Sequence, residues 1–312
     1  MATFIDFCSG IGGGRLAFDN LGLRCLGFSE INKNAERTYR TFFGRDEVNF
    51  GDVTKIVPHE LPDFDFMVAG FPCQTFSDMG KRAGFNDTRG QIIFSLIDIL
   101  NAKRCKGFLL ENVKGLVYHD KGRSLNVILQ SLEDAGYKVH WQVLNSINYG
   151  VPQMRERVYF VGFRDDVDFT FPTPSAQTPD VKDFLIDDWP LVGKEYQTFL
   201  GYLNKNKYQV EQLLDNEYLV IDTRQSDMRL YYNRVPTLRS DRHGILYVRD
   251  KELKKLSGLE SLLLQGFPRE LAMKATGSGL RDQAGNAMTV STIQAIGLGV
   301  RGLWGSSCMS DS

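Results

Sequence analysis

The sequence predicts an α/β protein built on a doubly wound, mostly parallel sheet, with a second, smaller domain. Short apolar runs alternate with longer helical patterns over the first ~170 residues of the 312-residue chain, and a stretch with three prolines, FPTPSAQTP at 171–179, follows them. Strands that alternate with crossover helices form parallel sheets, which bind ligands at the carboxyl ends of their strands. Polar residues that follow the predicted strands are therefore the first candidates for a functional site.

The predicted elements form a βαβ succession, and the proline-rich stretch after them is typical of a linker. Five apolar runs predict buried strands: TFIDFC (3–8), RCLGFSE (24–30), FDFMVAG (64–70), GFLLENV (107–113) and RVYFVGF (157–163). Four stretches predict helices: RLAFDNLG (15–22), KNAERTYRTFF (33–43), GQIIFSLIDILNAK (90–103) and SLNVILQSLEDAG (124–136).

The composition is that of an ordinary soluble globular protein, with 42% hydrophobic residues. The chain shows no leader pattern and no apolar stretch near the ~20 residues that span a bilayer, so we expect a cytoplasmic protein with no membrane partner. The five cysteines form no CxxC pair and the four histidines are scattered. Neither a disulfide framework nor a metal site is expected from that spacing.

Charge is balanced overall but uneven along the chain. The sequence carries 37 Lys plus Arg against 38 Asp plus Glu. Residues 229–255 hold eight basic against three acidic residues, a local net of +5, whereas residues 165–195 hold two basic against eight acidic, a local net of −6. The basic stretch is either a local phosphate-binding surface or a solvated charged face.

A glycine-rich turn follows the first predicted strand, in FIDFCSGIGGG at 4–14, and Glu30 ends the second strand. Glycines let a backbone approach a ligand closely, and a carboxylate at this spacing can accept two ribose hydroxyls. The pattern therefore predicts a nucleoside-containing cofactor. A dinucleotide such as NAD fits as well as an adenosine-based methyl donor, and a tight turn without any ligand is the third interpretation.

Three further groups follow later strands. Cys73 lies just after the third strand, in GFPCQTFS at 70–77, where a thiolate could act as a nucleophile. Glu111 ends the fourth strand, and strand periodicity over 153–163 places Gln153, Arg155 and Arg157 on one face. Taken singly, Cys73 could be an inert packed thiol and Glu111 a surface carboxylate at a helix start. Residues 153–163 could form an exposed edge strand.

Together these residues lie in segments that resemble, in order, the motifs of bacterial-type cytosine-5 DNA methyltransferases. The matching segments are FIDFCSGIGGGRLAF (cofactor loop), GFPCQTFS (nucleophile loop), DTRGQIIF, LENVKGL (acid strand), GVPQMRERVYFVGF (arginine strand), RVPTLRSDRHG, LLLQGFP and QAGNAMTVSTIQAIG. The resemblance covers nearly the whole chain. It implies the S-adenosylmethionine-dependent methyltransferase fold, which is Rossmann-like, and a target-recognition domain as the smaller domain.

The resemblance also implies roles for four catalytic residues. Cys73 would attack carbon 6 of a cytosine flipped out of a short specific duplex DNA sequence, and Glu111 would interact with ring nitrogen 3. Arg155 would hold the carbonyl oxygen at carbon 2, and Arg157 would support the thiol loop. The product would be 5-methylcytosine, and the base that takes the carbon 5 proton is not readable from the sequence.

S-adenosyl-L-methionine is the cofactor that the resemblance implies. Glu30 would bind its ribose, Asp52 its adenine amine, and Ile31 and Val53 would flank the adenine. Cys8 stands where many family members carry a phenylalanine that packs on the adenine, and Ala287 replaces a frequent serine. The whole implied cofactor-binding set is Phe7, Cys8, Ser9, Gly10, Gly12, Glu30, Ile31, Asp52, Val53, Pro72, Ile92, Asn286 and Ala287.

The implied organisation is a catalytic and cofactor-binding domain at 1–171, a target-recognition domain at 172–276, a return segment at 277–302 that completes the catalytic domain, and a tail at 303–312. The implied partner is double-stranded DNA, bound by a monomer without a metal. A cognate restriction endonuclease in a restriction-modification system is a further expectation. The residues expected to contact nucleic acid are Gln74, Ser77, Thr237, Arg239 and Arg242.

Two other functions stay open from the sequence. The first is an RNA or tRNA cytosine-5 methyltransferase on the same catalytic domain, which ENVKGL favours and the length of the region before RVPTL does not. The second is a nicotinamide-dependent oxidoreductase that uses the glycine turn and Glu30. That function leaves Cys73, Glu111 and Arg155 without a role.

Overall fold

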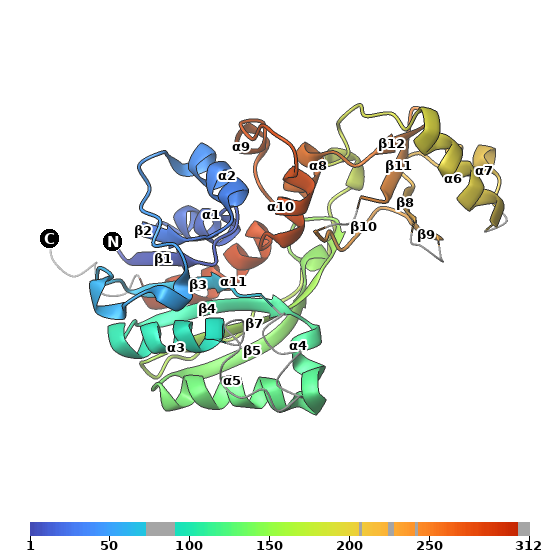
Figure 1. The fold of residues 1–312 in the computed structure, drawn as a ribbon. Coiled ribbons are helices and arrows are strands. Elements are labelled where there is room, and N and C mark those ends of the chain that lie inside the picture. Colours follow the sequence, from blue (N-terminus) through green and yellow to red (C-terminus); the bar gives the residue numbers. More distant parts are fainter. Residues whose placement is uncertain (73–90, 206–207, 224–227, 241–242, 305–312) are drawn as a thin grey trace, which may run out of the picture. The chain divides into compact units, whose positions relative to one another are not determined.

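The computed structural model describes residues 1–72, 91–205, 208–223, 228–240 and 243–304 (Figure 1). The chain divides into two compact units. Unit 1 comprises Met1–Asn145, Glu156–Pro174 and Ala287–Ser312, and unit 2 comprises Ser146–Arg155 and Ser175–Asn286. Residues 146–155 thus belong to unit 2, although the residues on either side of them belong to unit 1. The predicted domain limits place this segment in the catalytic domain at 1–171. The roles of the two units stay predictions.

Unit 1 contains a six-stranded sheet in the order β2-β1-β3-β4-β7-β5. Strands β2, β1, β3 and β4 run parallel, and β7 is antiparallel to both β4 and β5. The prediction of a mostly parallel α/β sheet is confirmed. The strands are β1 Thr3–Phe7, β2 Arg24–Ser29, β3 Phe66–Gly70, β4 Gly107–Val113, β5 Lys138–Asn145 and β7 Glu156–Phe163.

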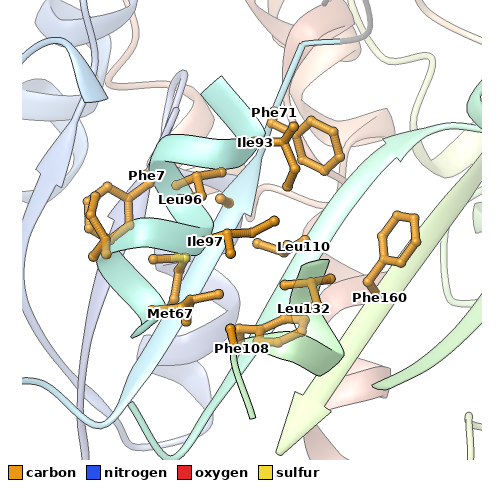
Figure 2. Close-up of a cluster of buried hydrophobic side chains, with 14 of the residues drawn as sticks. Phe7, Met67, Phe71, Ile93, Leu96, Ile97, Phe108, Leu110, Leu132 and Phe160 are labelled. Carbon is orange, nitrogen blue, oxygen red and sulfur yellow. The ribbon is translucent and has the colours of Figure 1, made fainter. Parts of the chain in front are cut away.

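Helices cover both faces of this sheet. Helices α3 and α5 share a core with β1, β3, β4 and β7, in which Ile93, Leu96 and Ile97 of α3 pack with Met67 and Leu110 (Figure 2). Helices α1 and α11 pack against each other on the opposite face. The helical segments of unit 1 are α1 Gly13–Asn20, α2 Lys33–Phe43, η1 Val53–Lys55, η2 Pro58–Glu60, α3 Gln91–Lys103, α4 Gly115–Tyr118, η4 His119–Gly122, α5 Arg123–Asp134 and α11 Val290–Trp304.

The local sequence explains why these helices form where they were predicted. Asn32 caps α2, because its side chain accepts the backbone N–H groups of Asn34 and Ala35. The buried residues of α2 recur at intervals of three and four, which gives the helix one apolar face. They are Ala35, Thr38, Tyr39 and Phe42.

Two expectations about strands were wrong. No strand was predicted over β5, which is an edge strand with mostly exposed or half-buried side chains and therefore lacks a continuous apolar run. The single strand expected from Gln153 onward is interrupted at Arg155. Gln153–Met154 forms β6, which pairs with β10, Val235–Pro236, whereas β7 pairs with β4 and β5. The strand ends because its two halves have different partners.

Unit 2 has a smaller, four-stranded antiparallel sheet in the order β12-β11-β8-β9. The sequence predicted a second, smaller domain but not this sheet, and the predicted fold class is confirmed. The strands of this sheet are β8 Val220–Thr223, β9 Met228–Tyr231, β11 Ile245–Arg249 and β12 Glu252–Lys255. The helical segments of unit 2 are η5 Ser146–Asn148, η6 Val181–Asp183, α6 Gly193–Lys205, α7 Val210–Leu214, α8 Gly258–Leu264, α9 Arg269–Ala272 and α10 Leu280–Asn286. Within the described ranges, no helix is long and apolar enough to cross a membrane.

Candidate active site

The glycine turn links β1 to α1 through three residues with left-handed backbone. These are Cys8, Gly10 and Gly12, with φ values of 49°, 55° and 87°. Gly13 must be a glycine for a different reason, since a Cβ there would lie 2.3 Å from the carbonyl oxygen of Met288. Met288 follows directly on Ala287, so the chain after residue 286 returns to pack on the glycine turn within unit 1.

Glu30 is held against this turn by backbone donors. Its Oε2 accepts the N–H of Gly10 at 2.8 Å, and its Oε1 accepts the N–H of Asn32 at 2.7 Å. The N–H of Ser9 also donates to the carbonyl oxygen of Ser29 at 3.1 Å. The structure therefore brings together the first two groups that the sequence predicted for a cofactor, the glycine turn and the carboxylate at the end of β2.

Asp52 and Val53 lie in the next segment of the same region. The Asp52 side chain caps η1 by accepting two hydrogen bonds from Thr54. The backbone N–H of Thr54 donates at 3.0 Å and its side-chain hydroxyl donates at 2.7 Å. The hydrogen bond from the Thr54 hydroxyl is the main cause that lowers the pKa of Asp52. Val53 is buried, whereas Ile31, which follows Glu30 in the sequence, is 68% exposed.

These residues fit an adenosine-containing ligand. A Cβ built on Gly10 or on Gly51 would meet no heavy atom within 4 Å, so space is open beside both backbones. Glu30 and Asp52 supply acceptors for ribose hydroxyls and for an amino group, and exposed Ile31 supplies an apolar surface for a ring. These acceptors, the apolar surface and the open space are what a nucleoside needs.

Cys8 is part of the wall of this region rather than a reactive group. Its side chain packs on the main hydrophobic core of unit 1. Burial raises the pKa of Cys8 well above its ordinary value, and Glu30, Asp6 and Asp52 raise it further. The thiol is therefore neutral at physiological pH and contributes an apolar contact. Phe7 and Ser9 are buried, and Ile92 is half-buried against the same core.

Glu111 and Arg157 form a nearly buried ion pair between neighbouring strands. Arg157 Nε lies 3.1 Å from Glu111 Oε1, and the two side chains are 11% and 9% exposed. Strands β4 and β7 pair antiparallel through this region, with Glu111 opposite Tyr159 and Val113 opposite Arg157. Glu111 is therefore not a surface carboxylate at a helix start, and its position on β4 is set by the sheet.

Asn112 ties the end of β4 to the segment that leads toward Cys73. Its side chain is 1% exposed, and its Nδ2 donates to the carbonyl oxygen of Phe71 at 3.0 Å. Exposed Pro72 follows Phe71. Sequence reasoning assigned Asn112 no role, although its place in the Glu-Asn-Val motif was a signal. Four predicted site residues lie outside the described residues: Cys73, Gln74, Ser77 and Arg242.

Arg155 belongs to unit 2, where it anchors backbone. It is buried, and its Nη1 donates to the carbonyl oxygens of Leu238 at 2.9 Å and Gly285 at 3.1 Å. The Thr237 hydroxyl donates to the carbonyl oxygen of Met154 at 2.5 Å. Residues 154 and 155 thus hold the 237–238 segment in place. The expected contact of Arg155 with cytosine stays a prediction.

Unit 2 also contains three other predicted residues: Gln153, Arg239 and Asn286. Gln153 is fully buried, donates to the carbonyl oxygen of Leu264 at 2.8 Å and accepts the N–H of Leu238 at 3.0 Å. Arg239 and Asn286 are exposed. A Cβ on Gly285 would lie 2.4 Å from the carbonyl carbon of Arg239, so helix α10 packs closely on the backbone of the predicted DNA-contacting segment.

The fold combines a glycine turn and a strand-end carboxylate, as in nucleoside-binding α/β enzymes, with a carboxylate and arginine pair on adjacent strands. Residues 2–300 match the family described as C-5 cytosine-specific DNA methylase. The chain belongs to that family. It is an S-adenosylmethionine-dependent DNA (cytosine-5)-methyltransferase, close to the bacterial type II methyltransferases.

Curated relatives agree with this assignment, and solved structures share the fold. The chain is 37% identical to the type II methyltransferase M.NgoBI of Neisseria gonorrhoeae, over 95% of this chain and 92% of that protein. It is 39% identical to the type II methyltransferase M.HaeII of Haemophilus aegyptius, over 94% of this chain and 90% of that protein. In fold it resembles the Entamoeba histolytica methyltransferase EhMeth, with a TM-score of 0.75 and 18% identity over 97% of this chain and 99% of that one. The nicotinamide-dependent oxidoreductase interpretation is therefore wrong.

Proposed function

We propose that this protein methylates carbon 5 of a cytosine flipped out of a short specific sequence in duplex DNA, through a covalent adduct with Cys73. The observation that carries the proposal is the buried Glu111–Arg157 pair at the end of β4, with Asn112 beside it holding Phe71, two residues before Cys73. Strands β4 and β7 thus bring together the carboxylate of Glu111, the guanidinium of Arg157 and Asn112, which holds the segment before Cys73.

The proposed chemistry uses each of these groups. The Cys73 thiolate adds to carbon 6 of cytosine and forms a carbon–sulfur bond, while Glu111 at nitrogen 3 offsets the negative charge that develops on the ring. Carbon 5 thereby becomes nucleophilic. After methylation, loss of the carbon 5 proton and elimination of Cys73 release 5-methylcytosine and restore the thiolate. Arg157 keeps Glu111 oriented through the ion pair.

S-adenosylmethionine supplies the methyl group as an electrophilic sulfonium substituent when it is bound. We assign its ribose to Glu30, its adenine amine to Asp52 and its adenine ring to Ile31 and Val53. The open space beside Gly10 and Gly51 supports this assignment. The rest of the implied set, including Pro72, Asn286 and Ala287, stays part of the same proposal.

We also propose a type II modification role for this chain. The relatives M.NgoBI and M.HaeII are named as type II methyltransferases. Unit 2 would read the DNA sequence, Thr237 and Arg239 would contact the backbone, and the protein would act as a monomer alongside a cognate endonuclease. Expression in a host without cytosine methylation, followed by sequencing for 5-methylcytosine, tests the activity and gives the recognition sequence. Methylation of RNA but not of duplex DNA would favour the RNA alternative.

Cys73→Ala tests the covalent step directly. This variant should lose methyl transfer and keep S-adenosylhomocysteine binding, because the thiolate takes part in chemistry and not in the cofactor site. Wild-type protein should form a denaturation-resistant adduct with duplex DNA that carries 5-fluorocytosine, since fluorine cannot leave as a proton. Cys308→Ala serves as the control and should form the adduct normally. Turnover by Cys73→Ala would remove Cys73 from the mechanism.

A further inference from the structure

The Asn49 side chain makes three hydrogen bonds to the backbone of Glu30 and Gly51, in the two segments that carry the proposed adenosine-binding carboxylates. Its Oδ1 accepts the N–H of Glu30 at 3.1 Å and the N–H of Gly51 at 2.9 Å, and its Nδ2 donates to the carbonyl oxygen of Glu30 at 2.9 Å. One side-chain amide therefore satisfies both main-chain groups of Glu30 and also holds the residue before Asp52.

The backbone explains why this residue can reach both places. Beyond the edge of the sheet, residues 48–50 run beside β2: Phe28 donates to the carbonyl oxygen of Val48 at 2.9 Å, and Phe50 donates to that of Phe28 at 2.7 Å. Strand β2 ends at Ser29. The Asn49 side chain then supplies the next pair of hydrogen bonds, which a strand partner would otherwise make.

The consequence is that Glu30 is fixed from two directions. Asn49 holds its main chain, while Gly10 and Asn32 hold its carboxylate oxygens at 2.8 Å and 2.7 Å. The same Oδ1 atom fixes Gly51, next to Asp52. The Ser29 hydroxyl holds the other side of Gly51 by donating to its carbonyl oxygen at 2.6 Å. The spacing between the two carboxylates proposed to bind ribose and adenine therefore depends on the half-buried Asn49 amide together with Ser29.

We propose that Asn49 is a positioning residue that sets the distance between Glu30 and Asp52 and thereby the affinity for the adenosine half of the cofactor. This inference rests on the proposed roles of those two carboxylates. A residue that acts in this way should change cofactor binding and leave DNA binding and the chemical step unaffected.

The first test measures S-adenosylhomocysteine binding to the purified full chain by calorimetry. Asn49→Ala should bind about tenfold more weakly, as expected for the loss of about one to two net hydrogen bonds. Turnover at saturating cofactor and the KM for DNA should stay within about twofold of wild type. Asn216→Ala is the matched control, because that amide lies in unit 2 and donates to the Gln212 carbonyl oxygen at 2.7 Å. Wild-type affinity in Asn49→Ala would overturn the inference.

The second test separates positioning from general stabilisation. An S-adenosylhomocysteine analogue without the ribose 2′-hydroxyl should bind wild type more weakly than the parent compound, and this loss should shrink in Asn49→Ala because Glu30 is no longer fixed. Asn49→Asp, which keeps both acceptor bonds, should show an intermediate effect and guards against simple misfolding of the alanine variant. An equal loss in all three proteins would mean that Asn49 only stabilises the fold. Failure of wild type to bind S-adenosylhomocysteine at all would instead contradict the proposed function.

Discussion

The two strand-end carboxylates of unit 1, Glu30 and Glu111, are held in different ways. Backbone N–H groups of Gly10 and Asn32 hold Glu30, which stays half-buried and carries no ion pair in the described chain. An arginine holds Glu111, which is nearly buried. A half-buried carboxylate held by neutral donors is suited to accept hydroxyls, whereas a nearly buried carboxylate paired with a guanidinium is suited to respond to developing charge.

The difference shows how one sheet can support both cofactor binding and the chemical step. The site near Glu30 is built from a turn and neighbouring loops, so its geometry depends on backbone hydrogen bonds. The site near Glu111 is built on paired strands, which hold side chains more rigidly than loops do. Substitutions on the two sides should therefore separate cofactor affinity from turnover.

Among substitutions at these two carboxylates and beside them, the largest effect is expected from Glu111→Gln, which keeps the shape but removes the carboxyl group. Turnover should fall about 10²- to 10³-fold, because the lost interaction strengthens as charge develops on the ring. DNA affinity, measured by fluorescence anisotropy, should change far less. Glu133→Gln, at an exposed position on α5, is the control. Equal losses in affinity and turnover would mean that Glu111 only positions the base.

A smaller effect of a different kind is expected from Glu30→Gln. The amide keeps one uncharged acceptor oxygen, but it no longer offers two charged oxygens to Gly10, Asn32 and a ribose. S-adenosylhomocysteine should bind about 10- to 100-fold more weakly by calorimetry, while turnover at saturating cofactor changes little. Glu60→Gln, an exposed residue of η2, serves for comparison. A fall in turnover without a change in affinity would erase the proposed contrast with Glu111.

The smallest effect should follow Ile31→Ala, which trims the exposed apolar surface beside Glu30. If this side chain packs on adenine, S-adenosylhomocysteine affinity should drop about fivefold, which corresponds to about 1 kcal/mol of lost apolar contact. The midpoint of thermal unfolding without ligand should not move, because Ile31 is 68% exposed. Val192→Ala, at a residue 64% exposed in unit 2, should affect neither quantity. Unchanged affinity in Ile31→Ala would place the adenine elsewhere.

Much of the fold could be predicted because its signals are local. The four helices expected in the first part of the chain are present as α1, α2, α3 and α5, since each has its own apolar pattern. The five predicted strands are present too, as β1, β2, β3, β4 and β7, although the strand periodicity expected over 153–163 is interrupted at Arg155. The glycine turn and Glu30 could be linked in advance because parallel strands place their carboxyl ends at one edge of the sheet.

The sequence by itself thus determined the α/β class, the order of most elements in the first ~170 residues and the residue types at the strand ends. Tertiary structure alone decided which partner each segment took. The break at Arg155 exists because β6 pairs with β10 while β7 pairs with β4 and β5, and no local pattern records such a change of partner. The contacts of Asn49 with Glu30, Asn112 with Phe71 and Arg157 with Glu111 join residues 19, 41 and 46 positions apart. Each of these side chains can bond to many groups, so its actual partner is set by the packing of the folded chain.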